Sequence, residues 1–461
     1  MHVYIPLSQP LFLIYVREQG QFHFRVRDSL SLFTHTLHSL GFRKAFSFVN
    51  TAIHYLITMI TYFFLSVLLH LLLSPLPLIA ATPLLPPRSP PPTLSFNPIS
   101  PPILIHPNAV YPRATTLFNL SSPTPDSPLL LTSYTTTHHS NGLKTLSAST
   151  SSHHPTQTWT FLSHIWTANA STHEIDNPFA LQLPNGNMLY AFRNHDIDPL
   201  TRKYTYYRIT LCVSTDFGRT WEFLSHASER AAKKENNGLW EPFLRVDGRG
   251  RVQIYYSSER GVNRQDNMLR VSGDGGRTWG EEVLVSRAGE GEESRDGMVG
   301  VAEVGGEEEG RLVCVFETTT EEEGGRRFAV GLVESFDDGE TWGQGTRRRV
   351  YTARKGKDAG APQVVSVGGV LVVSFMTNEG VSESEGGEGV DGGEMKIVLS
   401  RDGGRRWEGV GDGNGEGERA AVAAGRGSHW PGLFRLDDRR FLGLYSANGA
   451  GAVSRVFEIK G

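Results

Sequence analysis

Cysteine is nearly absent from this chain of 461 residues, in which Cys212 and Cys314 are the only two. Two cysteines exclude a disulfide-dense scaffold and a cysteine-rich zinc cluster. They could form one bridge, but two separate buried thiols are the favoured interpretation. An excess of one charge is also lacking, because 45 Lys and Arg face 49 Asp and Glu, for a net charge of -4. That balance provides no electrostatic reason to expect nucleic acid as a partner.

Long apolar runs are missing except in one place, residues 60–73, which are almost continuously hydrophobic. The run is short for a membrane span, which needs about 20 residues, and small residues follow it near Ala81, as in a secretory signal peptide. A chain that started at Met59 would give such a peptide its usual position. We therefore predict a mis-assigned or disordered extension over residues 1–58 and a signal peptide over residues 59–82, with an uncleaved signal anchor as the alternative.

Proline is dense just after this segment, because residues 83–102 contain three runs of consecutive prolines. Such a composition predicts an extended linker. The sequons Asn119-Leu-Ser121 and Asn169-Ala-Ser171 are compatible with secretion. The sequence thus predicts a secreted, extracellular protein with its folded domain over residues 103–461, and a membrane contact only if the apolar segment is an uncleaved anchor.

Four copies of the motif Ser-x-Asp-x-Gly-x-x-Trp divide the second half of the chain. They are Ser214-Thr-Asp216-Phe-Gly218-Arg-Thr-Trp221, Ser272-Gly-Asp274-Gly-Gly276-Arg-Thr-Trp279, Ser335-Phe-Asp337-Asp-Gly339-Glu-Thr-Trp342 and Ser400-Arg-Asp402-Gly-Gly404-Arg-Arg-Trp407. Counted from a degenerate copy that ends at Trp159, the tryptophans are spaced by 62, 58, 63 and 65 residues. Alternating residues before each motif predict a strand, and Asp and Gly favour a turn. An even period of this length is the signature of a repeat architecture.

These motifs resemble the Asp-box, or BNR, repeats of sialidase-like β-propellers. Residues 108–461 divided by the mean spacing of 62 come closest to six repeats, so we predict an all-β, six-bladed propeller. The last repeat needs an outer strand, which the segment Ile103-Leu-Ile105 could supply to close the ring. In the family such boxes lie on turns away from the catalytic face. We therefore expect a structural role for the four aspartates, Asp216, Asp274, Asp337 and Asp402.

Stretches rich in Gly and Glu fall between the predicted strands. We expect mobile loops at residues 289–293, 305–310, 321–325, 383–394 and 409–418. Calcium binding by these loops is a less favoured alternative. The pairs His138-His139 and His153-His154 have no carboxylate at ligand spacing, so neither a metal nor a cofactor is expected.

A second repeat, strand–turn–strand, follows each tryptophan. The first of these strands should line the central channel of a propeller, and its start lies beside the end of the second strand. Polar residues at those two places should therefore ring one mouth of the channel. They are Asn177, Arg193, Asn194, His195, Glu241, Glu259, Asp296, Glu317, Glu379, His429 and Asn448.

Glu241 and Glu317 stand out in this ring because both are flanked by apolar residues. Poor solvation raises the pKa of a carboxyl group, as a general acid requires. The two glutamates come from adjacent blades and could face each other across a sugar. A separation of about 5–5.5 Å would imply retention of anomeric configuration, and about 6.5–9.5 Å would imply inversion. For Glu259 and Glu379 we expect solvated strand ends instead.

Several of these segments are similar to fungal exo-arabinanases of glycoside hydrolase family 93. The similar segments are Asn177-Pro-Phe, Phe192-Arg-Asn-His195, Asn237-Gly-Leu-Trp-Glu-Pro-Phe243, Tyr255-Tyr-Ser, Arg295-Asp-Gly-Met298, Val315-Phe-Glu317, Ala359-Gly-Ala-Pro-Gln363 and Val373-Ser-Phe-Met376. The resemblance covers residues 108–461. It implies a secreted six-bladed propeller that releases arabinobiose from α-1,5-linked arabinan with retention. Its two catalytic glutamates match Glu241 and Glu317, and Glu317 is the weakly favoured nucleophile.

The other residues of the mouth are candidates for binding a polysaccharide or oligosaccharide, each of which could equally serve packing. They are Asn177, Arg193, Asn194, His195, Trp240, Asp296, Gln363, His429 and Trp430. Asp296 could instead tune the pKa of Glu317, and the two tryptophans could stack on a sugar ring. We expect a monomer.

Two other functions remain open. A sialidase would need three arginines for the substrate carboxylate and a tyrosine nucleophile. Tyr111-Pro-Arg113 and Arg435 echo the arginines, but no convincing tyrosine is evident. A non-catalytic carbohydrate-binding propeller would bind glycan without turning it over.

Overall fold

The computed structural model divides the chain into two units, Met1–Ser89 and Pro90–Gly461. It describes residues 14–18, 21–25, 61–62, 65, 93–118, 129–138, 142–152, 158–234, 236–289, 292–305, 309–322, 325–381, 393–408 and 420–461. In the first unit, β1 (Ile14–Glu18) and β2 (Gln21–Arg25) pair antiparallel. Almost all of the predicted signal segment lies outside the described residues. Within the described residues, no helix has both the length and the apolar character needed to cross a bilayer.

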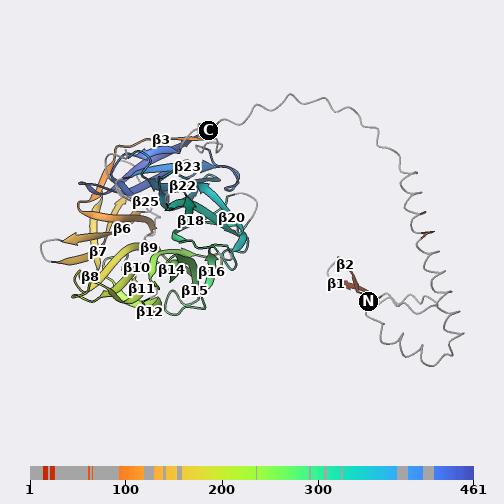
Figure 1. The fold of residues 1–461 in the computed structure, drawn as a ribbon, viewed down its shortest axis with the longest axis horizontal. Helices are drawn as coiled ribbons and strands as arrows, with labels where there is room; N and C mark the ends of the chain where they lie inside the picture. Colours follow the sequence, from red (N-terminus) through yellow and green to blue (C-terminus); the bar gives the residue numbers. More distant parts are fainter. Residues whose placement is uncertain are drawn as a thin grey trace. The chain divides into compact units, whose positions relative to one another are not determined.

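The second unit is a ring of six antiparallel sheets, which confirms the predicted propeller (Figure 1). Blades 1 to 3 are β5 (Ala109–Leu117), β6 (Leu129–His138), β7 (Leu143–Ser152), β8 (Thr160–Asn169); β9 (His173–Gln182), β10 (Met188–Ile197), β11 (Tyr204–Ser214), β12 (Glu222–Ala231); and β13 (Leu239–Val246), β14 (Val252–Gly261), β15 (Arg264–Ser272), β16 (Val283–Ser286). Blades 4 to 6 are β17 (Gly297–Glu303), β18 (Leu312–Glu322), β19 (Gly325–Ser335), β20 (Gly343–Tyr351); β21 (Ala359–Val367), β22 (Val370–Thr377), β23 (Glu394–Ser400), β24 (Ala421–Ala424); and β25 (Ser428–Arg435), β26 (Arg440–Ala447), β27 (Gly451–Lys460).

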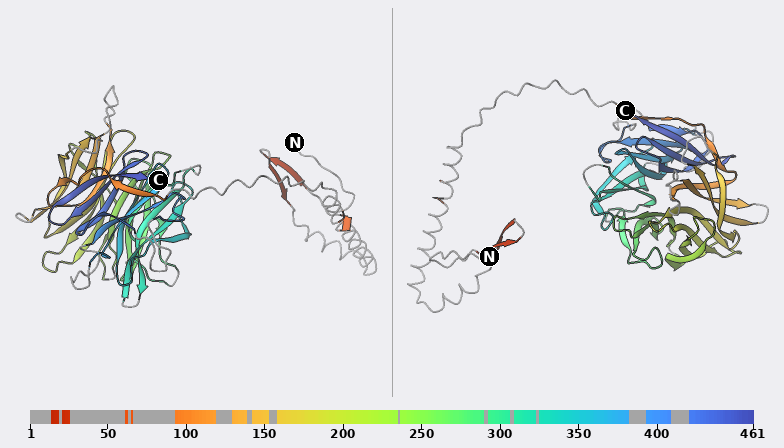
Figure 2. Two further views of the ribbon diagram at one scale, coloured as in Figure 1. Left: turned by 90° about the horizontal axis from the view of Figure 1, so that it is seen from above. Right: turned by 180° about the vertical axis from the view of Figure 1, so that it is seen from behind.

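The first strand of each blade is the innermost one. These six strands contact one another in order around the ring, and β25 contacts β5 to complete it. The ring also closes at the outer side of blade 6, where β27 pairs with β3 (Ser95–Pro98) and with β4 (Ile103–His106). In Figure 2 these orange strands lie against the blue C-terminal strand. The strand predicted near residues 103–105 is therefore confirmed, while β3 begins before the predicted boundary at residue 103.

Apolar side chains fill the spaces between neighbouring blades. Between blades 4 and 5, for example, Val315, Leu332 and Phe375 are fully buried in one cluster. Full burial of such a side chain is worth about 1.5–3 kcal/mol. Cys212 and Cys314 are both buried and free, as favoured from the sequence. Burial raises the pKa of Cys212 to about 12, so this thiol is unreactive at neutral pH.

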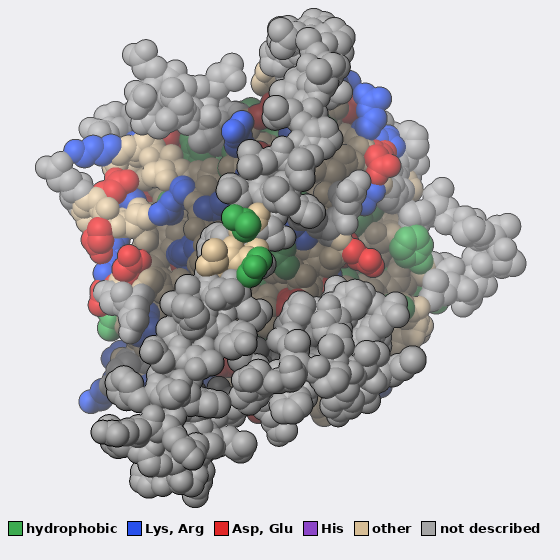
Figure 3. All heavy atoms as spheres, turned by 90° about the vertical axis from the view of Figure 1, so that its right-hand side faces the viewer, with side chains coloured by type: hydrophobic (Ala, Val, Ile, Leu, Met, Phe, Trp, Pro, Cys, Tyr) green, Lys and Arg blue, Asp and Glu red, His purple; other side chains and the backbone are tan. Residues whose placement is uncertain are grey.

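Charged side chains of both signs are interspersed on the described part of the face drawn in Figure 3. This mixture agrees with the nearly even balance of 45 basic and 49 acidic residues. The Gly/Glu-rich segment at residues 321–325 is only partly a loop, because β18 extends to Glu322 and β19 begins at Gly325.

The motif aspartates hold the turns between the third and fourth strands of their blades. Ser214 Oγ donates to Asp216 Oδ1 at 2.7 Å, the backbone N–H of Thr220 donates to the same oxygen at 2.9 Å, and Thr220 Oγ1 donates to Oδ2 at 2.6 Å. The serine bond and the N–H bond four residues on recur at Asp274, Asp337 and Asp402. Each of the four carboxylates therefore accepts hydrogen bonds within its own turn.

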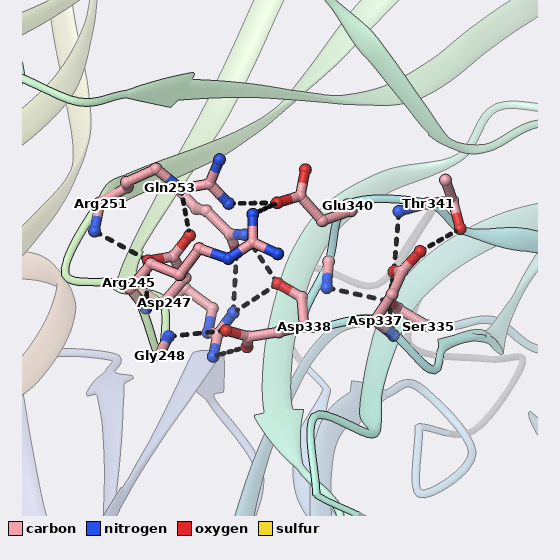
Figure 4. Close-up of polar contacts among 12 residues, drawn as sticks. Arg245, Asp247, Gly248, Arg251, Gln253, Ser335, Asp337, Asp338, Glu340 and Thr341 are labelled. Atoms are coloured by element: carbon pink, nitrogen blue, oxygen red, sulfur yellow. Dashed lines mark hydrogen bonds and ion pairs between the residues drawn. The ribbon is translucent and has the colours of Figure 1, made fainter. Parts of the chain in front are cut away.

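The motif of blade 4 departs from the others by carrying Asp338 and Glu340, and it contacts blade 3 (Figure 4). Asp338 Oδ1 accepts a hydrogen bond from Arg245 Nη2 at 2.6 Å, and its Oδ2 accepts one from the backbone N–H of Gly248, also at 2.6 Å. Glu340 accepts hydrogen bonds from Arg249 and Arg251. A set of ion pairs thus joins these two blades at the turn that follows β13.

We expect Asp216→Ala to lower the free energy of unfolding by about 1 kcal/mol at pH 7, the usual scale for losing a side-chain cap on backbone N–H groups. Burial acts to raise the pKa of Asp216, but hydrogen bonds from Thr220, Ser214 and Arg219 outweigh it and lower the pKa to about 2. A lowered pKa gives stability that is complete above the unfolded value of 3.8 and is lost as pH falls toward 2. The difference between the variant and the wild type should therefore shrink as urea unfolding is repeated from pH 5 down to pH 3.

Asp438→Ala is the matched control, since the Asp438 side chain is 77% exposed. The control should leave the urea midpoint nearly unchanged. If Asp216→Ala unfolds like the wild type at pH 7, the carboxylate does not stabilise its turn.

Candidate active site

Every inner strand carries a β-bulge at the same end of its blade. The pairing of the first and second strands shifts register at this point in all six blades. One residue of each bulge has a positive φ that non-glycine residues rarely adopt. These residues are Tyr111 (φ 54°), Asn177 (52°), Glu241 (39°), Met298 (51°), Ala361 (51°) and Trp430 (46°).

The bulge residues surround one pocket at the mouth of the channel. Tyr111, Asn177, Glu241 and Met298 line it directly, together with Arg113, Pro178, Phe179, Pro242, Val299 and Gln363. The remaining two bulge residues adjoin it, because Trp430 stacks on Tyr111 with ring centroids 4.3 Å apart and Ala361 packs with Met298 and Met376. The mouth thus combines the polar side chains of Asn177, Glu241, Arg113 and Gln363 with an apolar side formed by Met298, Ala361 and Trp430.

Glu241 sits at the bulge of β13, with its side chain 20% exposed. Burial raises the pKa of Glu241 to about 7. Arg193, whose Nη1 lies 4.0 Å from Glu241 Oε1, opposes this shift, as does Arg295. The negative charge of Glu317 adds to the rise in the pKa of Glu241.

Glu317 lies on β18 opposite Gly297 of β17. Burial raises the pKa of Glu317, and a hydrogen bond from the backbone N–H of Ala361 to its Oε2, 2.8 Å long, opposes that rise. A Cβ atom on Gly360 would lie 2.8 Å from the same oxygen. The bulge of blade 5 therefore needs glycine there in order to bring its N–H against the carboxylate.

Two of the predicted sugar-binding residues, Asn177 and Gln363, line the pocket, and a third, Arg193, approaches it through Glu241. Asn177 is buried and its Oδ1 has no hydrogen-bond partner. Gln363 lines the pocket and donates to the carbonyl of Val299 at 3.2 Å. Arg193 donates to Glu174 at 2.6 Å, while its buried Nε has no partner. Unpaired buried polar atoms of this kind are rare and can bind the hydroxyl groups of a ligand.

Three other predicted residues pack between blades 2 and 3. His195 is fully buried, with its ring edge-on to Tyr204, Tyr207 and Trp240. Burial, together with the charge of Arg193, lowers the pKa of His195 to about 3, so it is neutral. Asn194 is buried and donates to Thr210 at 3.3 Å. His195, Asn194 and Trp240 thus pack between blades 2 and 3, while His195 Nε2, Asn194 Oδ1 and Trp240 Nε1 are buried without hydrogen-bond partners. Sugar contact by these three residues stays a prediction.

Asp296 is also withdrawn from the pocket, because it is fully buried and paired with Arg347. Arg347 Nη1 donates to Asp296 Oδ2 at 2.6 Å, and Nη2 donates to Oδ1 at 2.8 Å. Ser286 Oγ also donates to Oδ2 at 2.8 Å. Neither oxygen is left for a sugar, and Asp296 is not among the charges that shift the pKa of Glu317. The prediction of a sugar contact or pKa tuning by Asp296 is not supported by this geometry.

His429 and Trp430 lie at the start of β25. His429 Nε2 is 3.0 Å from Asn448 Oδ1, and its buried Nδ1 has no partner. Trp430 is half-buried against Tyr111 and leaves part of its surface exposed at the apolar side of the mouth. Of the two predicted stacking residues, Trp430 is the one at the mouth.

Glu259 and Glu379 are not solvated, so the expectation for both was wrong. Glu259 is 6% exposed and accepts a hydrogen bond from Arg295 Nη1 at 3.0 Å. Glu379 is 6% exposed and accepts hydrogen bonds from Lys396 at 2.8 Å and from the Tyr351 hydroxyl at 2.6 Å. Their cationic partners, Arg295 and Lys396, come from other segments of the chain. The position of a glutamate at a strand end does not predict such a partner.

Arg295, Tyr111 and Arg113 were named from the sequence only within motif segments and not as residues of the arabinanase-like site, although Tyr111 and Arg113 line the pocket. Arg113 is buried and donates to the carbonyls of Pro112 and Trp430 at 2.9 and 3.1 Å. A signal for the pocket was present, because five of the six bulge residues directly precede a proline. Among the described residues, no group of three or more His, Cys, Asp or Glu side chains is arranged to hold a metal ion.

The ring resembles several solved structures. An α-L-arabinanase from Penicillium chrysogenum, solved with arabinobiose, is 18% identical over 79% of this chain and 98% of its own, with a TM-score of 0.57. The GH93 α-L-arabinofuranosidase of Fusarium graminearum, also solved with arabinobiose, is 17% identical over 77% and 96%, with a TM-score of 0.51. A protein of unknown function from Dyadobacter fermentans is 14% identical over 79% and 99%, with a TM-score of 0.53.

No protein-family model and no curated protein sequence matches the chain. The resemblance inferred from the sequence motifs is thus confirmed at the level of the fold, since at these identities a structural likeness shows the fold alone.

We expect Glu317→Gln to lower the pKa of Glu241 from about 7, because the substitution removes a negative charge that raises it. Titration of the glutamate carboxyl groups by 13C NMR would measure the shift, with Glu241→Gln used to assign the resonance. Glu340→Gln, in the turn of the blade 4 motif, is the control and should leave the resonance unshifted. An unchanged titration in Glu317→Gln would show that the two carboxylates do not interact.

Proposed function

We propose that this protein is a secreted, monomeric glycoside hydrolase that cleaves α-1,5-linked arabinan and releases arabinobiose with retention. The observation that carries the proposal is that two glutamates lie at one mouth of the channel, since Glu241 lines the pocket and Glu317 accepts the backbone N–H of Ala361, a bulge residue that packs beside it. The solved structures with a similar fold include two that contain arabinobiose, which supports the choice of substrate. The motif resemblance to family 93 arabinanases supports the same choice.

The environments of the two glutamates suggest their roles. Glu241, with a pKa raised to about 7, holds a proton near neutral pH and would donate it to the glycosidic oxygen as the bond to the leaving sugar breaks. Glu317 accepts the N–H of Ala361, which favours its ionised form, and would attack the anomeric carbon. The product of this step is a glycosyl ester on Glu317 and a neutral leaving sugar.

A water molecule would complete the reaction. Glu241, now ionised, would take a proton from the water as its oxygen attacks the anomeric carbon, and the ester bond to Glu317 would break. Both carboxyl groups then return to their starting protonation states. Two inversions at one carbon give net retention.

The pocket offers binding groups for a neutral sugar. Asn177 Oδ1 and Arg193 Nε are buried polar atoms without partners, suited to hydroxyl groups. Met298, Met376 and Trp430 provide an apolar wall for the C–H face of a sugar ring.

Incubation of the purified protein with debranched arabinan should release arabinobiose, identified by chromatography and mass spectrometry. Glu241→Gln and Glu317→Gln should each lower turnover by at least about a hundredfold, the usual scale for losing a positioned acid or base. Arg249→Gln, at an exposed residue in the turn between β13 and β14, is the matched control and should keep wild-type turnover. Wild-type activity in either glutamate variant removes that residue from the mechanism.

Two outcomes would favour other functions. Tight binding of arabinan without release of any sugar would support a non-catalytic carbohydrate-binding propeller. Hydrolysis of a fluorogenic sialoside, with arabinan untouched, would support a sialidase.

Azide rescue separates the roles of the two glutamates. In Glu317→Gly, azide should attack in place of the missing nucleophile and give a glycosyl azide of inverted configuration from an activated arabinoside. In Glu241→Gly, azide should intercept the glycosyl enzyme and give the retained configuration. Proton NMR of the products distinguishes these results, and the reverse pattern would exchange the two roles.

A further inference from the structure

Arg295 occupies a junction between the strands that carry the two glutamates. It precedes β17, and Gly297, two residues further along the chain, pairs with Glu317 on β18. Its backbone N–H donates to Thr319 Oγ1 at 3.0 Å, two residues beyond Glu317 on the same strand. The main chain at Arg295 is therefore anchored to the strand of Glu317.

The side chain of Arg295 reaches in the other direction, toward blade 3. Its Nη1 donates to Glu259 Oε1 at 3.0 Å, and its Nη2 donates to Gln265 Oε1 at 2.9 Å. The other oxygen of Glu259 accepts the backbone N–H of Gly238 at 2.9 Å, three residues before Glu241. One chain of contacts thus runs from the segment of Glu241 through Glu259 and Arg295 to the strand of Glu317.

The groups that hold Arg295 are shielded from solvent, because Glu259 is 6% exposed, Gln265 is 4% exposed and Thr319 is 9% exposed. The Arg295 side chain itself is 29% exposed. A guanidinium held by two buried acceptors has a fixed position, and its field is screened less than that of a charge at the open surface.

We propose that Arg295 is a positioning residue whose fixed charge, held by Glu259, sets the pH range in which Glu241 is protonated while Glu317 is ionised. The inference deepens the proposed hydrolase function and rests on it for its kinetic readout.

The charges around the two glutamates give Arg295 and Glu259 opposite effects. Arg295 lowers the pKa of both Glu241 and Glu317, whereas Glu259 raises the pKa of Glu241. The other charged groups that face the pair are Arg193, Arg113 and Glu317 beside Glu241, and Asp358 beside Glu317. Removal of the cation and removal of its anionic partner should therefore move the pH profile in opposite directions.

In Arg295→Gln, both limbs of the profile of kcat/KM against pH should move to higher pH, by about 0.5 to 1 unit, near the low end of shifts caused by a neighbouring opposite charge. The acidic limb moves because Glu317 ionises at higher pH, and the alkaline limb moves because Glu241 keeps its proton longer. Arg295→Lys, which keeps the charge, should show a smaller shift.

In Glu259→Gln, the alkaline limb should move to lower pH by a similar amount, because a negative charge that raises the pKa of Glu241 is gone. The amide oxygen can still accept the N–H of Gly238, which keeps the local fold. Arg249→Gln is again the control, with no shift in either limb. Thermal unfolding of each variant would verify that it remains folded at the assay temperature.

A merely structural role for the ion pair predicts a different result. Both variants would then lose stability and turnover without opposite shifts of the limbs. Unmoved limbs in Arg295→Gln, or shifts of the same sign in both variants, would overturn the proposal.

A direct titration separates this proposal from the hydrolase function. If the wild type releases no sugar from arabinan, the hydrolase proposal fails, but 13C NMR of the glutamate carboxyl groups still reports the pKa of Glu241. That pKa should rise in Arg295→Gln and fall in Glu259→Gln. An unchanged pKa in both variants would overturn the role of Arg295 whatever the activity.

Discussion

A left-handed residue in the inner strand of every blade is the constraint on which the site depends. A bulge places two residues of one strand against one residue of its partner and bends the strand locally. Because the six inner strands form a closed ring, six such bulges fall around one opening. A non-glycine residue in this conformation costs of order 1–3 kcal/mol, so the surrounding packing must hold it. The stacking of Tyr111 on Trp430 and the cluster of Met298 with Ala361 supply such packing.

The same β-bulge therefore presents a different side chain in each blade. Blade 2 presents an amide at Asn177, blade 3 presents a carboxyl group at Glu241, and blades 4 and 5 present small or apolar groups. Residues from the second strands of the blades add further groups to this ring. Glu317 from β18 receives the N–H of the blade 5 bulge, so the backbone of one sector stabilises the charge of another. The asymmetry of the pocket thus comes from the side chains and not from the scaffold.

The architecture could be predicted from the sequence because its signals are local. The turn chemistry of Ser214, Asp216 and Gly218 repeats at a fixed period, and the period alone gives the number of blades. The two glutamates could also be selected, since their apolar neighbours along the chain indicate poor solvation. What could not be predicted was which partner the packing brings to each polar side chain, within a blade or from the next one. Asp296 meets Arg347, and His195 meets Trp240, through packing that no strand pattern contains.

The contact of β27 with β3 and β4 has a consequence for how the ring is made. Backbone and side-chain bonds there join residues 355 positions apart, as between Arg455 and Ser100. Such remote partners must find each other late and at a high cost in chain entropy, so assembly of this domain is expected to be slow. During synthesis β3 and β4 emerge early, and their pairing partner β27 becomes available only when the last residues of the chain have been made. The sixth blade therefore closes the ring, and the other five blades form an open arc until β27 pairs with β3 and β4.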